Sequence, residues 1–285
     1  MHQSTRSNQN SARFTAALLG LGLITAASQP ALANDRRFTF VYESETMPAT
    51  ALEVEQWVTL RAGRKELVGG VNDLQNFNQW DLRTELEYGV TDIYQVALYL
   101  NSSQQSFRDA TGTDHSEFTF KGVSFENIVN IVNPANHAVG VSLYLEPSYS
   151  GDEAEIETKI IIGQRHGEWK WALNLEHAVE WENQLRDVEG EFGASFGIAR
   201  NLGKNWSIGL EARSVTKMPD YREVESTAVY VGPVVSYRGE KWWAALTVLP
   251  QVFGRNWDGA NDAARNLDLV HNERLNIRFL IGFDL

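Results

Sequence analysis

Hydrophobic and polar residues alternate with a period of two along most of the chain. In the stretch DLRTELEYGVTDIYQVALYL (residues 81–100), apolar residues such as Leu82 and Leu86 share one parity, whereas Glu85 and Glu87 share the other. This alternation places apolar and charged side chains on opposite faces of a β-strand. About twelve segments of this kind follow one another. The pattern therefore predicts an all-β chain.

Two kinds of connection join these segments. Short turns such as GVTD and NLGKN alternate with longer polar connections such as WENQLRDVEGE. Strands of about nine to eleven residues cross a bilayer when they are tilted. The order predicts an up-and-down antiparallel transmembrane β-barrel of about twelve strands, with its apolar face toward lipid. A soluble β-sandwich alternates in the same way and is the alternative fold. Pro233, inside YVGPVVSY, predicts a bulge or a strand end there.

Aromatic residues gather next to the short turns. This is expected where a membrane meets water. We predict an interfacial aromatic belt formed by Tyr88, Tyr94, Trp169, Trp206, Tyr237 and Trp242. The final strand alternates apolar and aromatic residues up to Leu285 and resembles the signal by which outer-membrane barrels are recognised for assembly, although an aromatic is the commonest last residue there.

The first residues read as a secretory signal peptide. Basic residues precede an apolar stretch, and Ala31-Leu32-Ala33 forms a cleavage site, so we expect residues 1–33 to be removed. Residues 34–50 then form a periplasmic segment or a plug, and residues 51–285 form the barrel. The expected location is the cell outer membrane after Sec-type export. Its lipid, lipopolysaccharide and the barrel assembly machinery are the expected partners.

Composition narrows the classes of partner and cofactor. The chain has no cysteine, which excludes disulfides and thiolate zinc sites. Its net charge is −12 without a cluster of Lys or Arg, which argues against nucleic-acid binding. We expect no cofactor.

Four motifs carry a resemblance to a known family. They are YESETMP (42–48), EQWVTLR (55–61), RTELEYGVTD (83–92) and GEKWWAALTVLPQ (239–251). With these motifs the chain resembles an outer-membrane β-barrel family of unknown function in Gram-negative bacteria, over essentially its whole mature length. The resemblance implies the barrel fold and its location, and no functional residues.

The inner face of the predicted barrel is rich in charge. The lumen-lining residues are expected to be Glu53, Glu55, Arg83, Glu85, Glu87, Glu126, Glu155, Glu157, Lys159, Glu176, Glu211, Arg213 and Arg278. One interpretation is a conducting lining that favours cations because acid outnumbers base. The other is a network of ion pairs that fills a narrow barrel.

Catalytic and metal chemistry have weaker support. Glu153, Glu155 and Glu157 share a face, but same-face neighbours are nearly 7 Å apart, so no metal site is expected there. DGAND (258–262) lacks the spacing of a calcium loop. Ser142 and Ser195 face inward without an evident histidine partner, so we expect no catalytic residues and no enzyme.

Three functions of a barrel stay open at this point. A passive channel or transport barrel for small solutes, with cations favoured, is the first interpretation. A structural or adhesive barrel that acts through its long loops is the second. An envelope lipid hydrolase is the third, because the fold could still bring a serine to a histidine.

Overall fold

The computed structural model describes residues 36–64, 66–68, 71–73, 77–109, 111–257 and 266–285. The signal peptide predicted for residues 1–33 lies outside these residues, as does the DGAND sequence. In the described part, no helix is long and apolar enough to cross a membrane.

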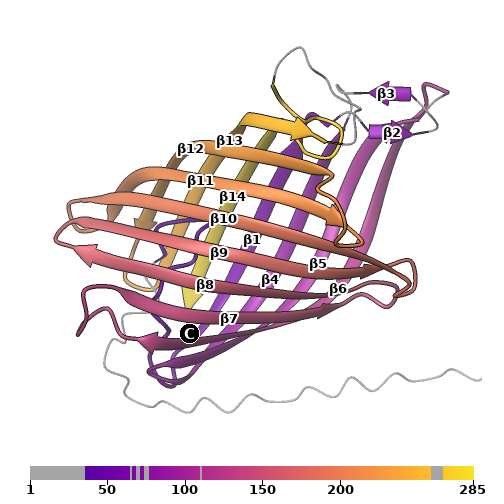
Figure 1. Cartoon of the computed structure of the whole chain (residues 1–285). Coiled ribbons are helices and arrows are strands. Elements are labelled where there is room, and N and C mark those ends of the chain that lie inside the picture. The colour runs from indigo at the N-terminus through magenta and orange to yellow at the C-terminus, as the bar shows by residue number, and fades with distance from the viewer. Residues whose placement is uncertain (1–35, 65, 69–70, 74–76, 110, 258–265) are drawn as a thin grey trace, which may run out of the picture. The chain divides into compact units, whose positions relative to one another are not determined.

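Twelve strands form one closed antiparallel barrel (Figure 1). Each strand pairs with its neighbours in chain order, and the first strand pairs with the last to close the ring. The barrel strands are β1 (Leu52–Ala62), β4 (Asn78–Thr91), β5 (Tyr94–Arg108), β6 (Asp114–Val132), β7 (Gly140–Tyr149), β8 (Ala154–His166), β9 (Trp169–Glu182), β10 (Asp187–Leu202), β11 (Trp206–Pro219), β12 (Ser226–Arg238), β13 (Trp242–Asn256) and β14 (Leu275–Asp284). The predicted all-β, up-and-down barrel is confirmed, and the β-sandwich alternative is wrong.

The alternation of the sequence sets the two faces of the wall. On β4, Glu85 and Glu87 are 1% exposed, whereas Leu86 between them is 46% exposed. On β5, Ala97 and Tyr99 are buried and Leu98 is 49% exposed. The apolar face therefore points out of the barrel and the charged face points into it, because only that orientation keeps large apolar side chains in a lipid environment.

The first long connection contains a feature that the sequence did not predict. A small hairpin of β2 (Glu66–Val68) and β3 (Val71–Asp73) forms a separate two-stranded sheet there. The hairpin is only three residues long on each side, too short for a period-two pattern to be recognised.

Strand β6 contains a local irregularity. Its register against β5 shifts between Asn101 and Ser102, where Lys121 is the extra residue on β6. The next residue, Gly122, has φ of +83°, and a Cβ there would lie 1.9 Å from the Tyr149 carbonyl oxygen. A glycine with positive φ beside an unpaired residue is the signature of a β-bulge.

Pro233 lies within β12 and not at a strand end. The register between β12 and β13 passes from Tyr230↔Gln251 to Val234↔Thr247, and it shifts between Val229 and Tyr230. Pro233 thus falls in a stretch where regular pairing with β13 is interrupted. A proline has no N–H to donate, so the interruption removes the need for that hydrogen bond.

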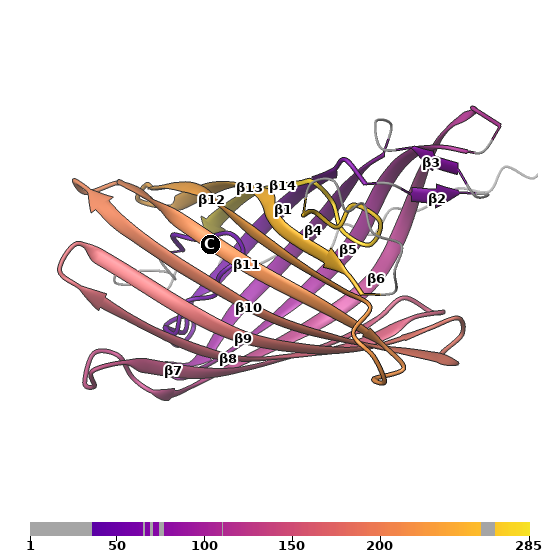
Figure 2. The same cartoon turned by 45° about the horizontal axis from the view of Figure 1, so that its top comes forward.

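Residues 36–48 lie inside the ring of strands, in the half toward the short turns (Figure 2). They form neither helix nor strand. Their side chains contact inner-face residues of many strands. We call the half of the lumen that they fill, toward the short turns, the lower half, and the half toward the long loops the upper half.

Candidate functional site: a lumen in two parts

The segment 36–48, which we call the inner segment, is almost wholly buried. Its residues Phe38 and Met47 are 1% and 0% exposed. Because the inner segment has no regular structure, its backbone N–H and C=O groups need other partners. Polar side chains of the barrel wall supply them.

Glu211 on β11 holds the middle of the inner segment. Its carboxylate is 0% exposed, and one of its oxygens, Oε1, accepts hydrogen bonds from three successive backbone N–H groups. These groups belong to Thr39, Phe40 and Val41, at 2.9, 2.9 and 3.1 Å. Three donors converging on one charged acceptor fix the local backbone strongly.

Side-chain amides of the barrel wall also bind the backbone of the inner segment. Asn174 accepts a hydrogen bond from the Tyr42 backbone N–H at 2.7 Å and donates one to the Tyr42 carbonyl at 2.9 Å. Gln95 accepts a hydrogen bond from the Met47 N–H at 2.7 Å. The reciprocal pair at Asn174 reproduces the pairing of a β-ladder with a side chain.

Inward glycines make room for the inner segment. A Cβ at Gly197 on β10 would lie 2.7 Å from the Phe38 ring, and one at Gly140 on β7 would lie 2.4 Å from Ser44 Oγ. Any side chain at these two positions would collide with the segment. The wall is therefore shaped to receive it.

Cations stack on aromatic rings where the inner segment ends and the open lumen begins. The guanidinium of Arg36 lies 4.6 Å from the ring centre of Tyr42 and 4.7 Å from that of Trp57, and it pairs with Glu55 at 3.0 Å. Arg278 lies 4.0 Å from the ring centre of Phe40. These contacts are of cation–π type and form the floor of the upper lumen.

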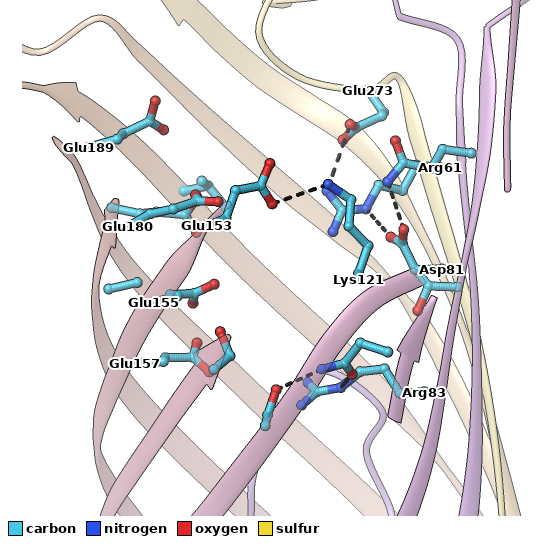
Figure 3. Close-up of a pocket in the computed structure, with 18 of the residues that line it drawn as sticks. Arg61, Asp81, Arg83, Lys121, Glu153, Glu155, Glu157, Glu180, Glu189 and Glu273 are labelled. Atoms are coloured by element: carbon cyan, nitrogen blue, oxygen red, sulfur yellow. Dashed lines mark hydrogen bonds and ion pairs between the residues drawn. The ribbon is translucent and has the colours of Figure 1, made fainter. Parts of the chain in front are cut away.

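Above this floor the barrel is hollow. A cavity of about 440 Å³, which we call the vestibule, is lined by inner-face residues of the long-loop half (Figure 3). Among the described lining residues, nine are Asp or Glu and seven are Lys or Arg. The described part of the lining thus has a formal excess of two negative charges.

The charges of the vestibule are segregated. Acidic side chains lie mainly on the wall from β7 to β10: Glu146, Glu153, Glu155, Glu157, Glu180, Glu189 and Glu191. Basic side chains lie on the remaining wall: Arg61, Arg64, Arg83, Lys121, Arg213, Lys217 and Arg278. Figure 3 shows the labelled glutamates of one wall across the cavity from Arg61 and Arg83. A field crosses the vestibule between these walls.

Some of these charged side chains form ion pairs with one another, and others do not. Arg83 meets Glu146 at 2.6 Å, and Lys217 meets Glu189 at 2.9 Å. No ion pair joins Glu155 or Glu180 to a basic side chain of the described residues. The carboxylates of the acidic wall are thus only partly neutralised, and a solute could meet them.

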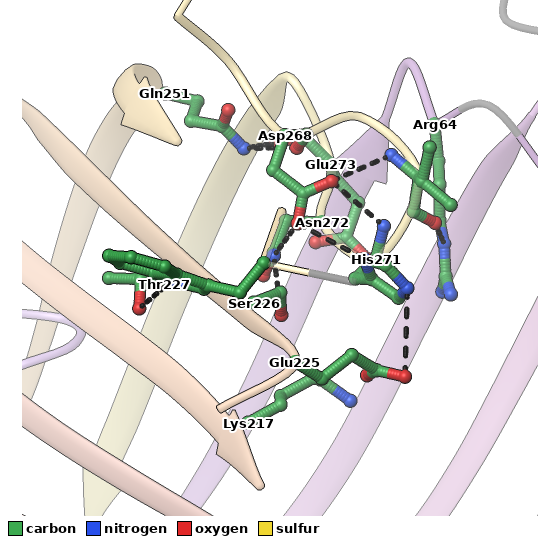
Figure 4. A network of polar contacts seen from close by, with 12 residues as sticks. Arg64, Lys217, Glu225, Ser226, Thr227, Gln251, Asp268, His271, Asn272 and Glu273 are labelled. Carbon is green, nitrogen blue, oxygen red and sulfur yellow. Dashed lines mark hydrogen bonds and ion pairs between the residues drawn. The ribbon is translucent and has the colours of Figure 1, made fainter. Parts of the chain in front are cut away.

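Residues 266–274, the described end of the last long connection, reach the vestibule, because His271, Asn272 and Glu273 contribute to its lining. Figure 4 shows the polar network that these residues form. In this connection, Asp268 and Leu269 are 2% and 1% exposed. Burial alone raises the pKa of Asp268, but hydrogen bonds from the His271 and Asn272 side chains and from the His271 backbone outweigh it, so the pKa is lowered. Gln251 donates hydrogen bonds to the Asp268 and Glu273 carbonyls at 2.8 and 3.1 Å. The carboxylate of Asp268 therefore organises this connection.

The two parts divide the residues predicted to line the lumen. In the lower half, buried around the inner segment, lie Glu53, Glu55, Glu85, Glu87, Glu126 and Glu211. The vestibule lining contains Arg83, Glu155, Glu157, Arg213 and Arg278. Between them Lys159 and Glu176 are paired in register, and Lys159 lies over the Tyr42 ring. Their functional roles stay predictions. The inward glycines Gly140 and Gly197 are a sequence signal of close packing inside the lumen, but they do not identify the segment that packs there.

The residues of the predicted aromatic belt lie on the outer face beside the short turns. Trp169, Trp206 and Trp242 are 49%, 53% and 40% exposed. The rings of Trp206 and Trp242 each lie 4.9 Å from that of Tyr237. Tyr88 is 40% exposed and Tyr94 is half-buried. Their place at a membrane interface stays a prediction.

The inward serines hold structure together in the described chain. Ser142 Oγ donates to the Ser44 carbonyl at 2.6 Å, and Ser195 Oγ donates to Glu176. His177, on the outer face, contacts the Tyr221 hydroxyl at 3.0 Å. The expectation that the chain is not an enzyme stays a prediction.

The fold defines the structural class of the protein. A closed antiparallel barrel with an apolar outer face and a charged interior is the architecture of outer-membrane β-barrels. An outer membrane channel from Pseudomonas putida F1 is similar, with 10% identity and a TM-score of 0.57, over 85% of this chain and 98% of that one. The NanC porin has 10% identity and a TM-score of 0.48, over 82% of this chain and 100% of that one.

The family follows from the sequence itself. The profile of a family of unknown function, DUF6662, matches residues 30–160 and 163–285. The chain belongs to this family, which confirms the resemblance drawn from the four motifs. Comparison with curated proteins found no match.

Proposed function

We propose that the protein is an outer-membrane channel for small polar solutes and that its inner segment closes the lumen on the short-turn side. The observation that carries the proposal is the charged vestibule of about 440 Å³, which lies inside a closed barrel and ends on the inner segment. A cavity of this size suits a small ligand. Its charged lining suits a polar one.

Selectivity follows from the lining. Its excess of two negative charges attracts cations and repels anions, so the open channel has a weak cation preference. Basic residues on the opposite wall keep the preference weak. Solutes that carry both charges can contact both walls at once.

The outer face supports the location. Large apolar side chains such as Leu86, Leu98 and Leu143 are 46%, 49% and 46% exposed there. Such a surface needs lipid, because a soluble protein rarely exposes so much contiguous apolar area. We therefore propose that the barrel lies in the outer membrane, in contact with its lipid and lipopolysaccharide. From the sequence pattern we further propose export with cleavage of residues 1–33 and assembly by the barrel machinery.

The absence of native cysteines allows a direct test of the closed lumen. A Cβ at Gly163 would lie 3.3 Å from Ser44 Oγ, close to the geometry of a disulfide. The variant Ser44→Cys with Gly163→Cys therefore locks the inner segment to β8 when oxidised. Conductance is measured in planar bilayers, with each single-cysteine variant as a control.

We expect unitary openings of the wild type and of both single variants. The oxidised double variant should be silent and should regain openings on reduction. Equal conductance of its verified oxidised and reduced forms would contradict closure by the inner segment. A folded wild type without conductance under any condition would contradict the channel itself.

A further inference from the structure

Five glutamates gather around the lower end of the lumen, beside the inner segment. The register sets Glu53 directly opposite Glu87, and Glu55 directly opposite Glu85, across β1 and β4. Like charges at directly opposed positions destabilise a sheet. All four side chains are at most 1% exposed, so water does not screen their repulsion.

The fifth carboxylate comes from β6. Ala97 on β5 pairs with Glu87 on one side and with Glu126 on the other. The small side chain of Ala97 leaves the space between the two glutamates open. Glu126 is 0% exposed.

Each of four carboxylates has one oxygen held by a neutral donor. Trp243 Nε1 donates to Glu53 at 2.6 Å, and Trp57 Nε1 donates to Glu85 at 3.0 Å. The Tyr99 hydroxyl donates to Glu126 at 2.6 Å, and the Gln95 amide donates to Glu87. The donors orient the carboxylates without neutralising them.

The other oxygen of each of these carboxylates has no hydrogen-bond partner among the described residues. These buried, unpartnered atoms are Glu53 Oε2, Glu85 Oε1, Glu87 Oε2 and Glu126 Oε1. A buried carboxylate oxygen without a partner is costly. This observation is independent of the clustering and points to a missing positive group.

The described chain supplies too little positive charge for the cluster. Arg36 pairs with Glu55 at 3.0 Å. The neighbouring cations Arg83 and Lys159 pair with Glu146 and Glu157, which lie outside the cluster. Five carboxylates thus share one arginine among the described ion pairs.

We propose that this cluster binds a divalent cation of the size of calcium. Oxygens of Glu85, Glu87 and Glu126 lie within 4.8 Å of one another, and so do oxygens of Glu53, Glu55 and Glu87. Two ligands on opposite sides of calcium are about 5 Å apart, whereas on magnesium they are about 4 Å apart. Carboxylate-only donors suit a hard cation.

The bound ion would connect the wall to the inner segment. Glu126 also accepts a hydrogen bond from the Tyr42 hydroxyl at 3.2 Å, and Glu55 holds Arg36. An ion at the cluster therefore stabilises the docked inner segment as well as the pairing of β1 with β4. The inference does not depend on conduction, since it is tested by binding.

The test uses the full protein in detergent, stripped with a chelator and titrated with calcium chloride in a calorimeter. Terbium is the second probe, because Trp57 and Trp243 hydrogen-bond to the cluster and can sensitise its luminescence. The variants are Glu87→Gln and Glu126→Gln, and the control is Glu168→Gln, an exposed glutamate between β8 and β9 that pairs with Arg200 and lies outside both the cluster and the vestibule. Heat-modifiable gel migration checks that each variant folds.

We expect one calcium ion per chain in the wild type and in the control. Each cluster variant should bind calcium about tenfold more weakly or worse, because loss of even an outer partner of a ligand costs about 10- to 100-fold. No binding by the wild type, or equal affinity of a folded cluster variant, would overturn the proposal. It would also be overturned by a carboxylic-acid infrared band that persists in calcium-treated wild type and disappears in Glu87→Gln, because protons would then neutralise the cluster.

Discussion

The two halves of the lumen are built from the same strands and differ in almost everything else. The lower half is filled by the inner segment, whose backbone is held by side chains such as Glu211 and Asn174. The upper half is hollow and lined by opposed charges. Period-two alternation makes a side chain point inward, but the size and hydrogen-bonding capacity of the inward residues decide whether the lumen is filled or open.

The largest expected effect comes from Glu211→Gln. The amide has the size of the carboxylate but lacks the charge that attracts three backbone N–H groups. A hydrogen bond to a charged group is worth about 1.5–3 kcal/mol, so the loss of about 2 kcal/mol would raise the open population roughly thirtyfold. Single-channel recording measures the fraction of time for which the channel is open. Glu191→Gln in the acidic wall is the control. An unchanged open fraction in Glu211→Gln would show that the three hydrogen bonds to Glu211 do not keep the inner segment in the closed position.

A second variant attacks the fit of the lower half. In Gly197→Ala the new Cβ would lie 2.7 Å from the Phe38 ring, and overpacking of this kind costs about 1–3 kcal/mol. We expect more frequent openings and greater proteolysis of the inner segment. Adding Phe38→Leu should restore the closed state by removing the ring, and failure of this rescue would argue against steric displacement.

Substitutions in the upper half should change the ion selectivity of the channel and not the fraction of time for which it is closed. Glu155→Gln combined with Glu180→Gln removes the two carboxylates for which the described residues provide no ion pair, which cancels the negative excess of the lining. The reversal potential in a salt gradient should move toward zero. Lys217→Gln, which removes a positive charge from the lining, should move the reversal potential the opposite way. Equal reversal potentials in all three proteins would show that the vestibule does not control permeation.

The smallest effect is expected in the last long connection, at Asp268. The pKa of Asp268 is lowered in the folded protein, so its stabilisation is present above the ordinary value of about 3.9 and is lost as the pH falls through the folded value. The protection of residues 266–274 against hydrogen exchange, expressed relative to the intrinsic exchange rate at each pH, should therefore fall in strongly acidic solution. In Asp268→Asn this protection should already be low at neutral pH and should change little with acid. If the variant lost protection with acid as the wild type does, this carboxylate would be excluded as the cause.

The barrel wall could be predicted from the sequence, but the position of the segment that fills its lower half could not. The alternation around Glu85 and Glu87 fixed which side chains face inward, because the period of a strand is a local property. The place of the inner segment depends on Glu211, which lies about 170 residues further along the chain. No local pattern reports such a contact. The buried carboxylate cluster was hidden for the same reason, since it requires the register of β1, β4 and β6.

The interrupted pairing at Pro233 also depends on neighbouring strands. The residue argued against a central strand, and the structure keeps the strand by relaxing its pairing to β13 alone. From the sequence it follows only that one ladder hydrogen bond must be missing, because proline has no N–H to donate. The neighbouring strand determines where the ladder can tolerate the loss.

The inner segment also has a consequence for assembly in time. Its residues come before every strand in the sequence, yet the Thr39 carbonyl accepts a hydrogen bond from Arg278 on the last strand, at 3.2 Å. Contacts so distant in sequence form late. The ring must therefore be nearly complete before these residues find their final partners, and the inner segment is among the last of the described parts of the molecule to become ordered.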